Sequence, residues 1–274
     1  MELATGDPAR AASFYAELFG WQVDGEVFKV DGRAVAGITR SRPDRPEGWL
    51  TYLAAPDLEA TAERVRAAYG RVLTRPEERA GARSVIVADA DGAMFGLWQA
   101  AGFAGAQLRG EPGTMAWADL LTGDAAGATA FYGSVFGWTL THEFGSGEWL
   151  TEAHDSVAGL ITGRYDRRWQ PSFQVADCPE PARHVERLGG RVTAGPVEMG
   201  LGRYVEILDP MGAPFAITAP VPRAVELSVA YNDITGLELT YGRVNGFSEG
   251  GPDDGPPFLR LACQPGLTAG RLST

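Results

Sequence analysis

The sequence predicts an α+β protein of two tandem domains, and two observations support this prediction. The first is a repeat: residues 5–21 read Thr-Gly-Asp, then Phe-Tyr, then Phe-Gly-Trp, and residues 122–138 show these motifs in the same order. Tyr15 and Tyr132 lie 117 positions apart, as do the two tryptophans, which indicates duplication of a whole domain. The second is the alternation of short strand patterns with helix patterns inside each copy.

Each domain is expected to contain two units of the βαβββ type. The first unit starts with a short strand at 2–4 and a helix that Asp7 caps, Pro8 begins and Gly20 ends. Strands follow at 21–23, 27–30 and 34–39. The second copy repeats this order with a strand at 114–121, a helix from Asp124 to Gly137, and strands at 138–140, 148–152 and 157–162.

The second unit of each copy follows the same pattern. In the first copy it has a strand at 49–55, a helix at 58–69 capped by Asp57, and strands at 71–74, 84–88 and 94–99. In the second copy it has a strand at 172–175, a helix at about 179–188 that Asp177 precedes, and strands at 191–193, 204–208 and 214–218. One unit cannot close its own sheet. Two units side by side are therefore expected to form a curved, mostly antiparallel sheet with the helices outside and a concave inner face, which is a natural place for a ligand.

The duplication sets the expected domain boundaries. The first domain covers 1–100, a linker covers 101–113, and the second domain covers 114–220. Each copy is long enough to bury its own core. The remaining C-terminal extension, 221–274, lies outside the duplication; within it, 225–244 is compatible with two strands, and 246–257 reads as a loop or a disordered segment.

Composition narrows the classes of partner. The 274 residues carry a net charge of −11, and 45% of them are hydrophobic, which is ordinary for a soluble globular protein. An acidic surface repels phosphate backbones and anionic lipids, so neither nucleic acid nor a membrane is expected as a partner. Cys178 and Cys263 have no metal-ligand spacing. The sequence shows neither a membrane-spanning apolar run nor a signal-peptide pattern, so we expect a cytoplasmic protein.

Several segments carry a resemblance to a known family. They are the paired Phe-Tyr and Phe-Gly-Trp helices, Val-Ala-Gly-Ile at 35–38, Asp-Ala-Asp-Gly at 89–92 and Asp-Pro-Met-Gly at 209–212. Over residues 1–220 the chain resembles the vicinal oxygen chelate superfamily of glyoxalases, ring-cleaving dioxygenases and bleomycin-resistance proteins, and most of all its tandem two-domain actinobacterial members. This resemblance implies the fold. It leaves the activity open, since the superfamily contains enzymes and plain binding proteins.

The resemblance also implies where a metal would be held. Metal enzymes of the superfamily place His, Gln or Glu ligands seven residues before the helix-capping Asp of a unit, four residues after the Gly of the Asp-containing turn, and on the strand that ends the first unit. The first such position falls before Met1, and the others in this sequence are Leu50, Trp117, Gln170, Gly96, Ala216, Gly37 and Gly159. Among these only Gln170 is a ligand type, and one amide is not a divalent-metal site.

The three histidines do not complete such a site. His142 and His154 are predicted in or beside hairpin turns, and His184 is predicted on a charged helix surface. We therefore predict no metal, no cofactor, and no metal-dependent glyoxalase or dioxygenase chemistry.

The same positions, with their neighbours two residues along each strand, predict a ligand-binding face. Its residues are Leu50, Tyr52, Met94, Gly96, Trp98, Trp117, Asp119, Gln170, Ser172 and Ala216. Such a face suits a flat, largely apolar molecule that stacks on tryptophan and is held by a few polar groups. The alternative is that Tyr52, Trp98 and Trp117 simply fill a closed core, because a packed face and a ligand-ready face have the same composition.

Two functions are compatible with these residues. The leading hypothesis is a metal-free protein that binds an aromatic natural product, such as an anthracycline-like polyketide, for sequestration, self-resistance or an accessory role in antibiotic biosynthesis. The alternative is a metal-independent enzyme, such as a hydroxylase partner, isomerase or cyclase, that uses Asp119, Gln170 or Tyr204. Asp119 and Glu2 occupy equivalent positions on the first strands, and a buried carboxylate there is suited to act as a general base. The sequence leaves open which domain holds the working site and whether a homodimer shares it.

Overall fold

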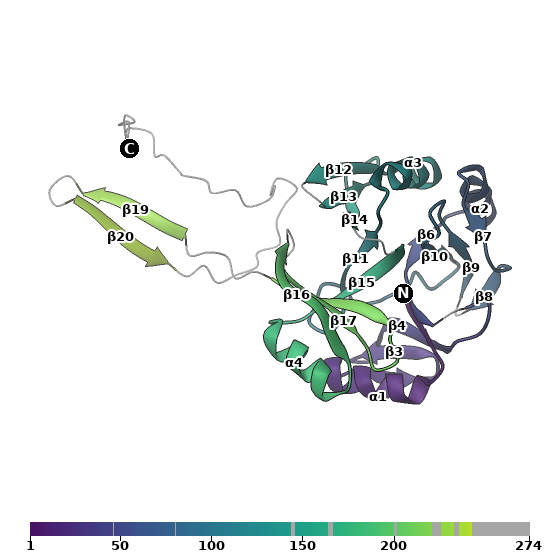
Figure 1. Ribbon diagram of the computed structural model, residues 1–274, viewed down its shortest axis with the longest axis horizontal. Helices are drawn as coiled ribbons and strands as arrows, with labels where there is room; N and C mark the ends of the chain where they lie inside the picture. The colour runs from purple at the N-terminus through teal and green to yellow at the C-terminus, as the bar shows by residue number, and fades with distance from the viewer. Residues whose placement is uncertain are drawn as a thin grey trace. The chain divides into compact units, whose positions relative to one another are not determined.

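The computed structural model describes residues 1–45, 47–79, 81–143, 146–163, 167–199, 202–220, 226–232 and 236–242. The chain divides into two compact units, Met1–Val221 and Pro222–Thr274, and the first holds both copies of the repeat (Figure 1). In the compact unit Pro222–Thr274, β19 (Glu226–Asn232) and β20 (Gly236–Gly242) form an antiparallel pair, which confirms the two strands predicted there. The predicted loop at 246–257 and Cys263 lie outside the described residues.

The first repeat, residues 1–100, forms two sheets that meet at a split strand. The elements of its first unit are β1 (Glu2–Thr5), α1 (Pro8–Phe19), β2 (Gln22–Asp24), β3 (Val27–Val30), β4 (Arg33–Arg40) and β5 (Gly48–Leu50), with strand order β2-β3-β4-β1-β5. Those of its second unit are β6 (Tyr52–Ala54), α2 (Leu58–Ala67), β7 (Arg71–Val72), β8 (Glu77–Arg79), β9 (Ala82–Ala88) and β10 (Met94–Ala100), with order β6-β10-β9-β7. The single strand predicted at 49–55 was wrong at Thr51, where it breaks, and β8, which pairs with β9, was not predicted.

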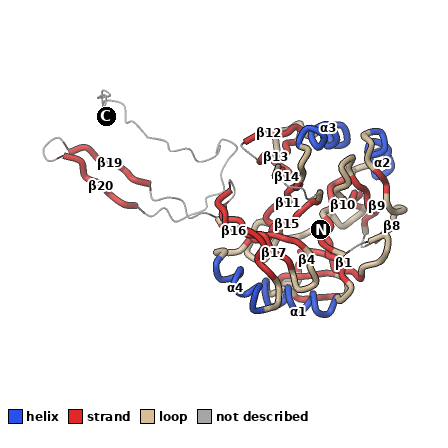
Figure 2. The backbone as a smooth tube through the Cα atoms, viewed as in Figure 1, coloured by secondary structure: helices blue, strands red, loops and turns tan. Residues whose placement is uncertain are grey.

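The second repeat, residues 114–220, forms one continuous eight-stranded sheet. Its elements are β11 (Met115–Leu121), α3 (Ala125–Phe136), β12 (Thr139–Glu143), β13 (Ser146–Leu150), β14 (Ser156–Ile161), β15 (Arg168–Gln174), α4 (Pro179–Arg187), β16 (Arg191–Met199), β17 (Gly202–Leu208) and β18 (Pro214–Ala219). The strand order is β12-β13-β14-β11-β15-β18-β17-β16. Most pairs are antiparallel, and the described helices lie at the periphery of the strands (Figure 2), which confirms the α+β class.

Local signals place the helices. The side chains of Asp7, Asp57 and Asp124 each accept a hydrogen bond from the backbone nitrogen three residues on, at 3.1, 2.9 and 2.8 Å, so three of the four helices in the described residues begin at the predicted caps. The fourth differs: the residue at the cap of α4 is Cys178, and Asp177 accepts from the Cys178 nitrogen instead. Within the described part of the chain, none of the helices combines the length and the apolar character needed to cross a bilayer.

The two repeats share their hydrophobic cores. One cluster joins Phe14 and Trp21 of the first repeat to Phe173 and Phe215 of the second. The other joins the second unit of the first repeat to the first unit of the second, and α2 packs against α3 as α1 packs against α4. The expectation that each copy buries its own core was therefore wrong, because each cluster draws side chains from both copies.

The tyrosine of the repeated motif lies at the centre of each shared core. Tyr15 donates a hydrogen bond to Asp209 Oδ2 at 3.0 Å and accepts one from Trp49 Nε1 at 2.9 Å. In the second repeat, Tyr132 donates to Asp89 Oδ2 at 3.0 Å and accepts from Trp169 Nε1 at 2.8 Å. Each tyrosine thus reaches an aspartate in a turn of the opposite repeat. We call these two Trp–Tyr–Asp chains the clasps.

Candidate functional site

The sequence predicted a concave face in each repeat, which is the side of its strands opposite the shared cores. The strand register places equivalent residues of the two repeats at the same points on this side. The pairs, first repeat before second, are Glu2 and Asp119, Leu50 and Gln170, Tyr52 and Ser172, Ser84 and Tyr204, Ile86 and Glu206, Gly96 and Ala216, and Trp98 and Thr218. The first face is therefore largely apolar and aromatic, whereas the second carries a cluster of polar side chains.

Part of the first face is filled by its own aromatic side chains. The rings of Tyr52 and Trp98 pack edge to face with centroids 5.3 Å apart. Tyr52 lies directly over Gly96, where a Cβ would overlap the ring. Leu50 is only half-buried and Met94 is 38% exposed, so these two predicted residues remain accessible beside the packed pair.

An arginine from the loop between β4 and β5 is buried against this face. Arg45 is 4% exposed, and its Nη1 lies 2.7 Å from Glu2 Oε2, which also accepts a hydrogen bond from the Tyr52 hydroxyl at 2.8 Å. Arg45 Nη2 lies 3.1 Å from Glu77 Oε2. Burial of a charged side chain costs free energy unless an opposite charge pairs with it, so the burial of Arg45 and of Glu2 each depends on the other. Arg45 lies between the predicted strands at 34–39 and 49–55, and the sequence carried no signal for this insertion.

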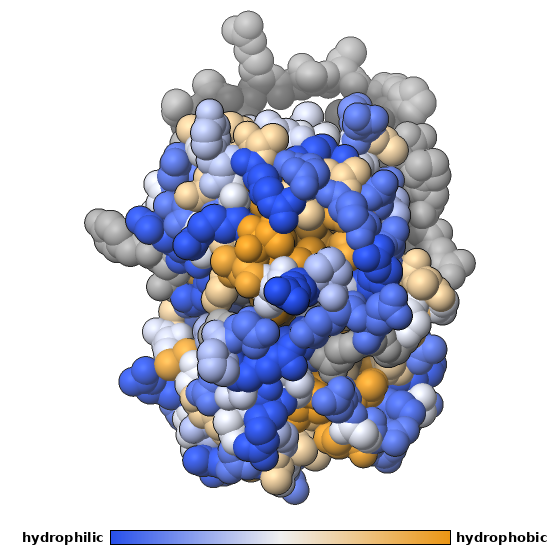
Figure 3. All heavy atoms as spheres, turned by 90° about the vertical axis from the view of Figure 1, so that its right-hand side faces the viewer, coloured by the Kyte–Doolittle hydropathy of each residue, from blue (hydrophilic) through white to orange (hydrophobic). Residues whose placement is uncertain are grey.

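A hollow of about 140 Å³ opens beside this ion pair, where β5 and β10 of the first repeat meet β15 of the second. Its apolar wall is Leu50, Ile86 and Met94. The rest of its lining is Glu2, Ala4, Arg45, Glu47, Gly48, Trp49, Arg167, Arg168, Trp169 and Pro214. Sequence reasoning found Leu50 and Met94 but missed Ile86, although Ile86 lies two residues from Ser84 on the same strand face. Figure 3 shows an apolar patch enclosed by hydrophilic residues on the side of the molecule where α2 and β7–β9 lie.

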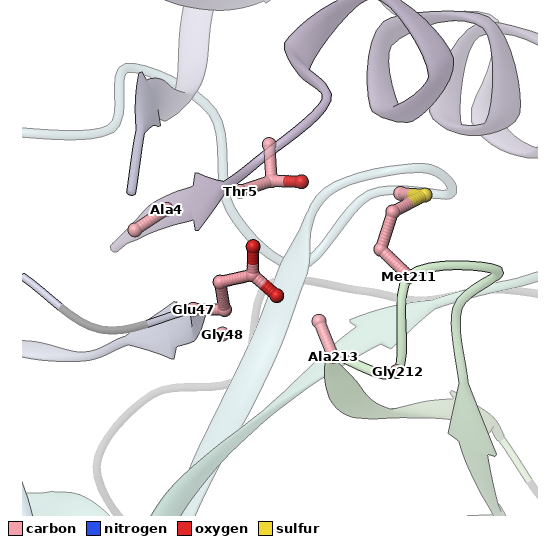
Figure 4. Close-up of a pocket in the computed structure, with 7 residues that line it drawn as sticks. All are labelled: Ala4, Thr5, Glu47, Gly48, Met211, Gly212 and Ala213. Carbon is pink, nitrogen blue, oxygen red and sulfur yellow. The ribbon is translucent and has the colours of Figure 1, made fainter. Parts of the chain in front are cut away.

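A smaller hollow of about 110 Å³ lies on the other side of Glu47 (Figure 4). Thr5 and the turn from Met211 to Ala213 line it, and the carboxylate of Glu47 stands between them. Glu47 Oε1 accepts hydrogen bonds from the Gly6 nitrogen at 2.9 Å and from Ser41 Oγ at 3.2 Å. Gly6 and Ser41 thus already bind this carboxylate, and only a few small apolar groups line the hollow.

On the second face, Gln170 is the centre of a hydrogen-bonded chain. It is 1% exposed, its Nε2 donates to the Tyr204 hydroxyl at 2.7 Å, and its Oε1 accepts from Arg168 Nε at 3.2 Å and Nη2 at 2.7 Å. Ser172 Oγ donates to the Trp117 carbonyl at 3.4 Å. Ala216 is fully buried beside Ser172 in the parallel pair of β15 and β18. Gln170 therefore orients Arg168, which lines the hollow of the first face.

Asp119 lies in the same cluster and is 9% exposed. A Cβ on Gly159 would overlap its Oδ1 and would lie 2.8 Å from Trp117 Nε1, so the carboxyl and the indole use the space that this glycine leaves. Burial, and then the charge of Glu206, raise the pKa of Asp119 to about 7. The pKa of Tyr204 is also raised, first by burial and then by Asp119. Glu206 was not predicted, although alternation along β17 puts it on the face of Tyr204.

The side chains at the metal positions implied by the resemblance do not fit a divalent ion. In the first repeat they are Leu50, Gly37 and Gly96, and in the second they are Trp117, Gly159, Gln170 and Ala216. Only Gln170 has a donor atom of the right kind, and Tyr204 and Arg168 already bind its amide. Among the residues that the structure describes, no three His, Cys, Asp or Glu side chains come together as a metal site. His184 lies in α4 and His154 in a turn, and the side chain of His142 lies outside the described set.

Comparison with known proteins adds family information to this geometry. A family model described as "Glyoxalase/Bleomycin resistance protein/Dioxygenase superfamily" matches residues 1–97. The anthracycline biosynthesis protein DauV of Streptomyces sp. (strain C5) is 33% identical over 262 residues, covering 84% of this chain and 93% of DauV. The protein CFP32 of Mycobacterium tuberculosis (strain CDC 1551 / Oshkosh), whose name refers to glyoxylase, is 34% identical over 81% of this chain and 94% of its own length.

Solved structures show the same fold. The Mn(II)-bound glyoxalase from Novosphingobium aromaticivorans superposes with a TM-score of 0.55 over 80% of this chain and 79% of that one. Its sequence identity to this chain is 16%, so the likeness concerns the fold alone.

Proposed function

Because this chain belongs to the glyoxalase/bleomycin resistance protein/dioxygenase superfamily, we propose that it binds an aromatic natural product and serves as an accessory protein in the biosynthesis of such a compound. The hollow on the first concave face carries this proposal. The match to DauV, named for anthracycline biosynthesis, supports a polycyclic aromatic as the ligand and favours an accessory role over sequestration or self-resistance.

The hollow suits part of an aromatic molecule. Leu50, Ile86 and Met94 form its apolar wall, and its volume of about 140 Å³ is close to that of a cavity that holds benzene, about 150 Å³. One ring of a larger ligand would fill it, and the remaining rings would extend beyond Met94, which is exposed. Since the metal positions do not fit an ion, the proposed binding uses packing and hydrogen bonds in place of chelation.

Tryptophan fluorescence tests this proposal directly, because Trp49 and Trp169 line the hollow. Titration with a panel of anthraquinones and anthracycline aglycones should give saturable quenching at micromolar ligand. Met94→Arg should weaken it by tenfold or more by placing a charge in the apolar wall. Val197→Arg, which changes another exposed apolar side chain in the same way, is the matched control. Absence of quenching by every compound would refute the proposal.

A second candidate is a metal-independent enzyme, and Asp119 is the observation that favours it. A carboxyl with a pKa of about 7 is suited to exchange protons at neutral pH, as general acid–base catalysis requires. Protein stripped of metal would then turn over a member of the same panel, and Asp119→Asn would abolish turnover while leaving binding intact. If the stripped wild type converts none of the compounds that it binds, the enzyme candidate is eliminated.

A further inference from the structure

We propose that Glu47 determines which aromatic molecules enter the hollow on the first face. Its carboxylate is the wall between this hollow and the smaller one beside Thr5, so the ligand must insert an end ring that carries no extended substituent. The inference rests on the proposed function. It adds the shape class of the ligand, fused rings with at least one unextended end, and the residue that selects for this shape.

The two hollows lie next to each other. Ala4, Glu47 and Gly48 line both of them, and among these three only Glu47 has a side chain longer than a methyl group. Figure 4 shows its carboxylate directed between Thr5 and the turn from Met211 to Ala213, into the smaller hollow. The volumes are about 140 and 110 Å³, so the larger hollow takes one aromatic ring, whereas the two joined would take a ring with a chain attached.

Two donors with fixed positions hold the carboxylate of Glu47 in this place. Its Oε1 accepts from the Gly6 nitrogen at 2.9 Å and from Ser41 Oγ at 3.2 Å. Ser41 is fixed to the end of β1, because its nitrogen donates to the Thr5 carbonyl at 2.9 Å, and the Gly6 carbonyl accepts from Arg40 Nη1 at 2.8 Å. A substituent that displaced the carboxylate would break both of its bonds and would place apolar carbon beside a charged group.

The walls of the smaller hollow do not depend on Glu47. One wall is β1, which pairs with β4 and β5. The other is the turn from Met211 to Ala213, whose two end residues each donate a backbone hydrogen bond to Asp209 Oδ1 at 2.9 Å. Asp209 in turn belongs to a clasp. Removal of the Glu47 side chain should therefore leave an open space that the surrounding elements cannot close.

The equivalent junction in the second repeat is bridged by an ion pair. The residues at the positions of Thr5, Glu47 and Met211 are there Thr122, Arg167 and Asp91. Arg167 Nε lies 3.2 Å from Asp91 Oδ1, and the Thr122 hydroxyl donates to Asp91 Oδ2 at 3.5 Å. Met211, by contrast, has no charge with which Glu47 could pair. The first repeat thus keeps a space that the second repeat bridges, and Glu47 separates this space from the ligand.

Two neutral probes that differ in length test the inference. We would titrate the full chain with 9,10-anthraquinone and with 2,6-bis(2-hydroxyethoxy)-9,10-anthraquinone, following tryptophan fluorescence. The second probe carries a chain at both ends, so neither of its end rings enters the hollow without a substituent. The wild type should bind the unextended probe about tenfold or more tighter than the extended one, because the chain would meet the Glu47 carboxylate.

Truncation of the wall should remove this discrimination. Glu47→Ala should reduce the ratio of the two affinities to about threefold or less by tighter binding of the extended probe, a gain that no folding defect would produce. Glu47→Gln keeps the length of the side chain and an accepting oxygen, so it should keep most of the ratio. Equal effects of the two changes would show that charge decides in place of size and would overturn the inference. Glu63→Ala, which removes an exposed carboxylate on α2, is the matched control and should leave the ratio unchanged.

A second variant reaches the same wall from the backbone. A Cβ on Gly6 would lie 2.7 Å from Glu47 Oε1, which is the far end of a flexible side chain, so Gly6→Ala should push the carboxylate aside. It should strengthen binding of the extended probe by about threefold or more, since the wall is moved. This variant decides the inference if Glu47→Ala does not fold: an unchanged ratio in Gly6→Ala would overturn it.

The outcomes distinguish the inference from the function on which it rests. Equal affinity of the wild type for the two probes would overturn the inference and leave the binding function standing, as would a ratio that Glu47→Ala does not lower. Quenching by other compounds of the panel without binding of 9,10-anthraquinone would also overturn it, because an unextended fused-ring molecule must bind. Absence of quenching by both probes and by the whole panel would remove the proposed function itself.

Discussion

Removal of the clasp hydroxyl by Tyr132→Phe should destabilise both repeats together. The hydroxyl donates to Asp89 Oδ2 and accepts from Trp169 Nε1, and all three side chains are buried. The change deletes two hydrogen bonds and adds no atom, so packing of the ring is preserved. Asp89 Oδ1 still accepts from three backbone nitrogens of its turn, at 2.8 to 3.0 Å, so the turn should keep its shape.

The magnitude follows from the two partners left behind. A hydrogen bond to a charged group contributes about 1.5–3 kcal/mol, and a buried indole N–H without an acceptor costs about 1–3 kcal/mol. Since water or small shifts will recover part of this, we expect a loss of about 2–4 kcal/mol in the free energy of unfolding. Tyr15→Phe removes the equivalent pair of bonds to Asp209 and Trp49 and should cost a similar amount.

Urea denaturation followed by tryptophan fluorescence and by far-UV circular dichroism measures this loss. Because each hydrophobic cluster contains residues of both repeats, the wild type and the two variants should unfold in a single transition with coincident probes. Tyr69→Phe is the control, since Tyr69 is 89% exposed and should change stability by less than about 0.5 kcal/mol. A loss below that value for Tyr132→Phe, or two separate transitions in the wild type, would refute the reasoning.

Three other predictions concern the concave faces. The raised pKa of Asp119 means that the folded protein keeps a proton that the unfolded chain releases. The free energy of unfolding should therefore fall as pH rises from about 4 to about 7, by up to roughly 4 kcal/mol. Asp119→Asn should flatten this fall in urea titrations at stepped pH. Gly159→Ala should cost about 1–3 kcal/mol in thermal unfolding because its Cβ overlaps the Asp119 carboxyl. Gly133→Ala on α3, whose Cβ would lie 3.3 Å from the Trp138 carbonyl oxygen, should cost much less, and equal effects would contradict the crowding argument. Arg45→Met should lower the free energy of unfolding by about 3–5 kcal/mol, because it removes the cation that pairs with the buried Glu2, and adding Glu2→Gln should restore part of this loss. A double variant no more stable than the single one would show that the ion pair is not the cause.

Much of the fold was readable because its signals are local. Asp7, Asp57 and Asp124 cap helices through residues three positions away, and such short-range geometry is the same in any protein. The predictions that were wrong or incomplete depend on distant partners. The break at Thr51 occurs where one strand passes from a sheet with β1 to a sheet with β10, and β16 extends well beyond 193 because β17 is there to pair with it.

The site was predictable as a surface but not as a cavity. Alternation along the strands identified the concave positions, and Leu50 and Met94 among them do line the hollow. Alternation does not say which side chains will pack against each other, as the rings of Tyr52 and Trp98 do. It also says nothing of Arg45, because a loop has no period from which to predict where its side chains point.

The sequence by itself determined the duplication, the α+β class, the order of elements and the residue types at the metal positions implied by the resemblance, because each of these depends on spacing along the chain. Only the tertiary structure decided that the repeats share their cores and that Arg168 of one completes a hollow in the other. The bond from Tyr15 to Asp209 joins residues 194 positions apart. No local pattern specifies such a partner, since it depends on how all the intervening strands pack against one another.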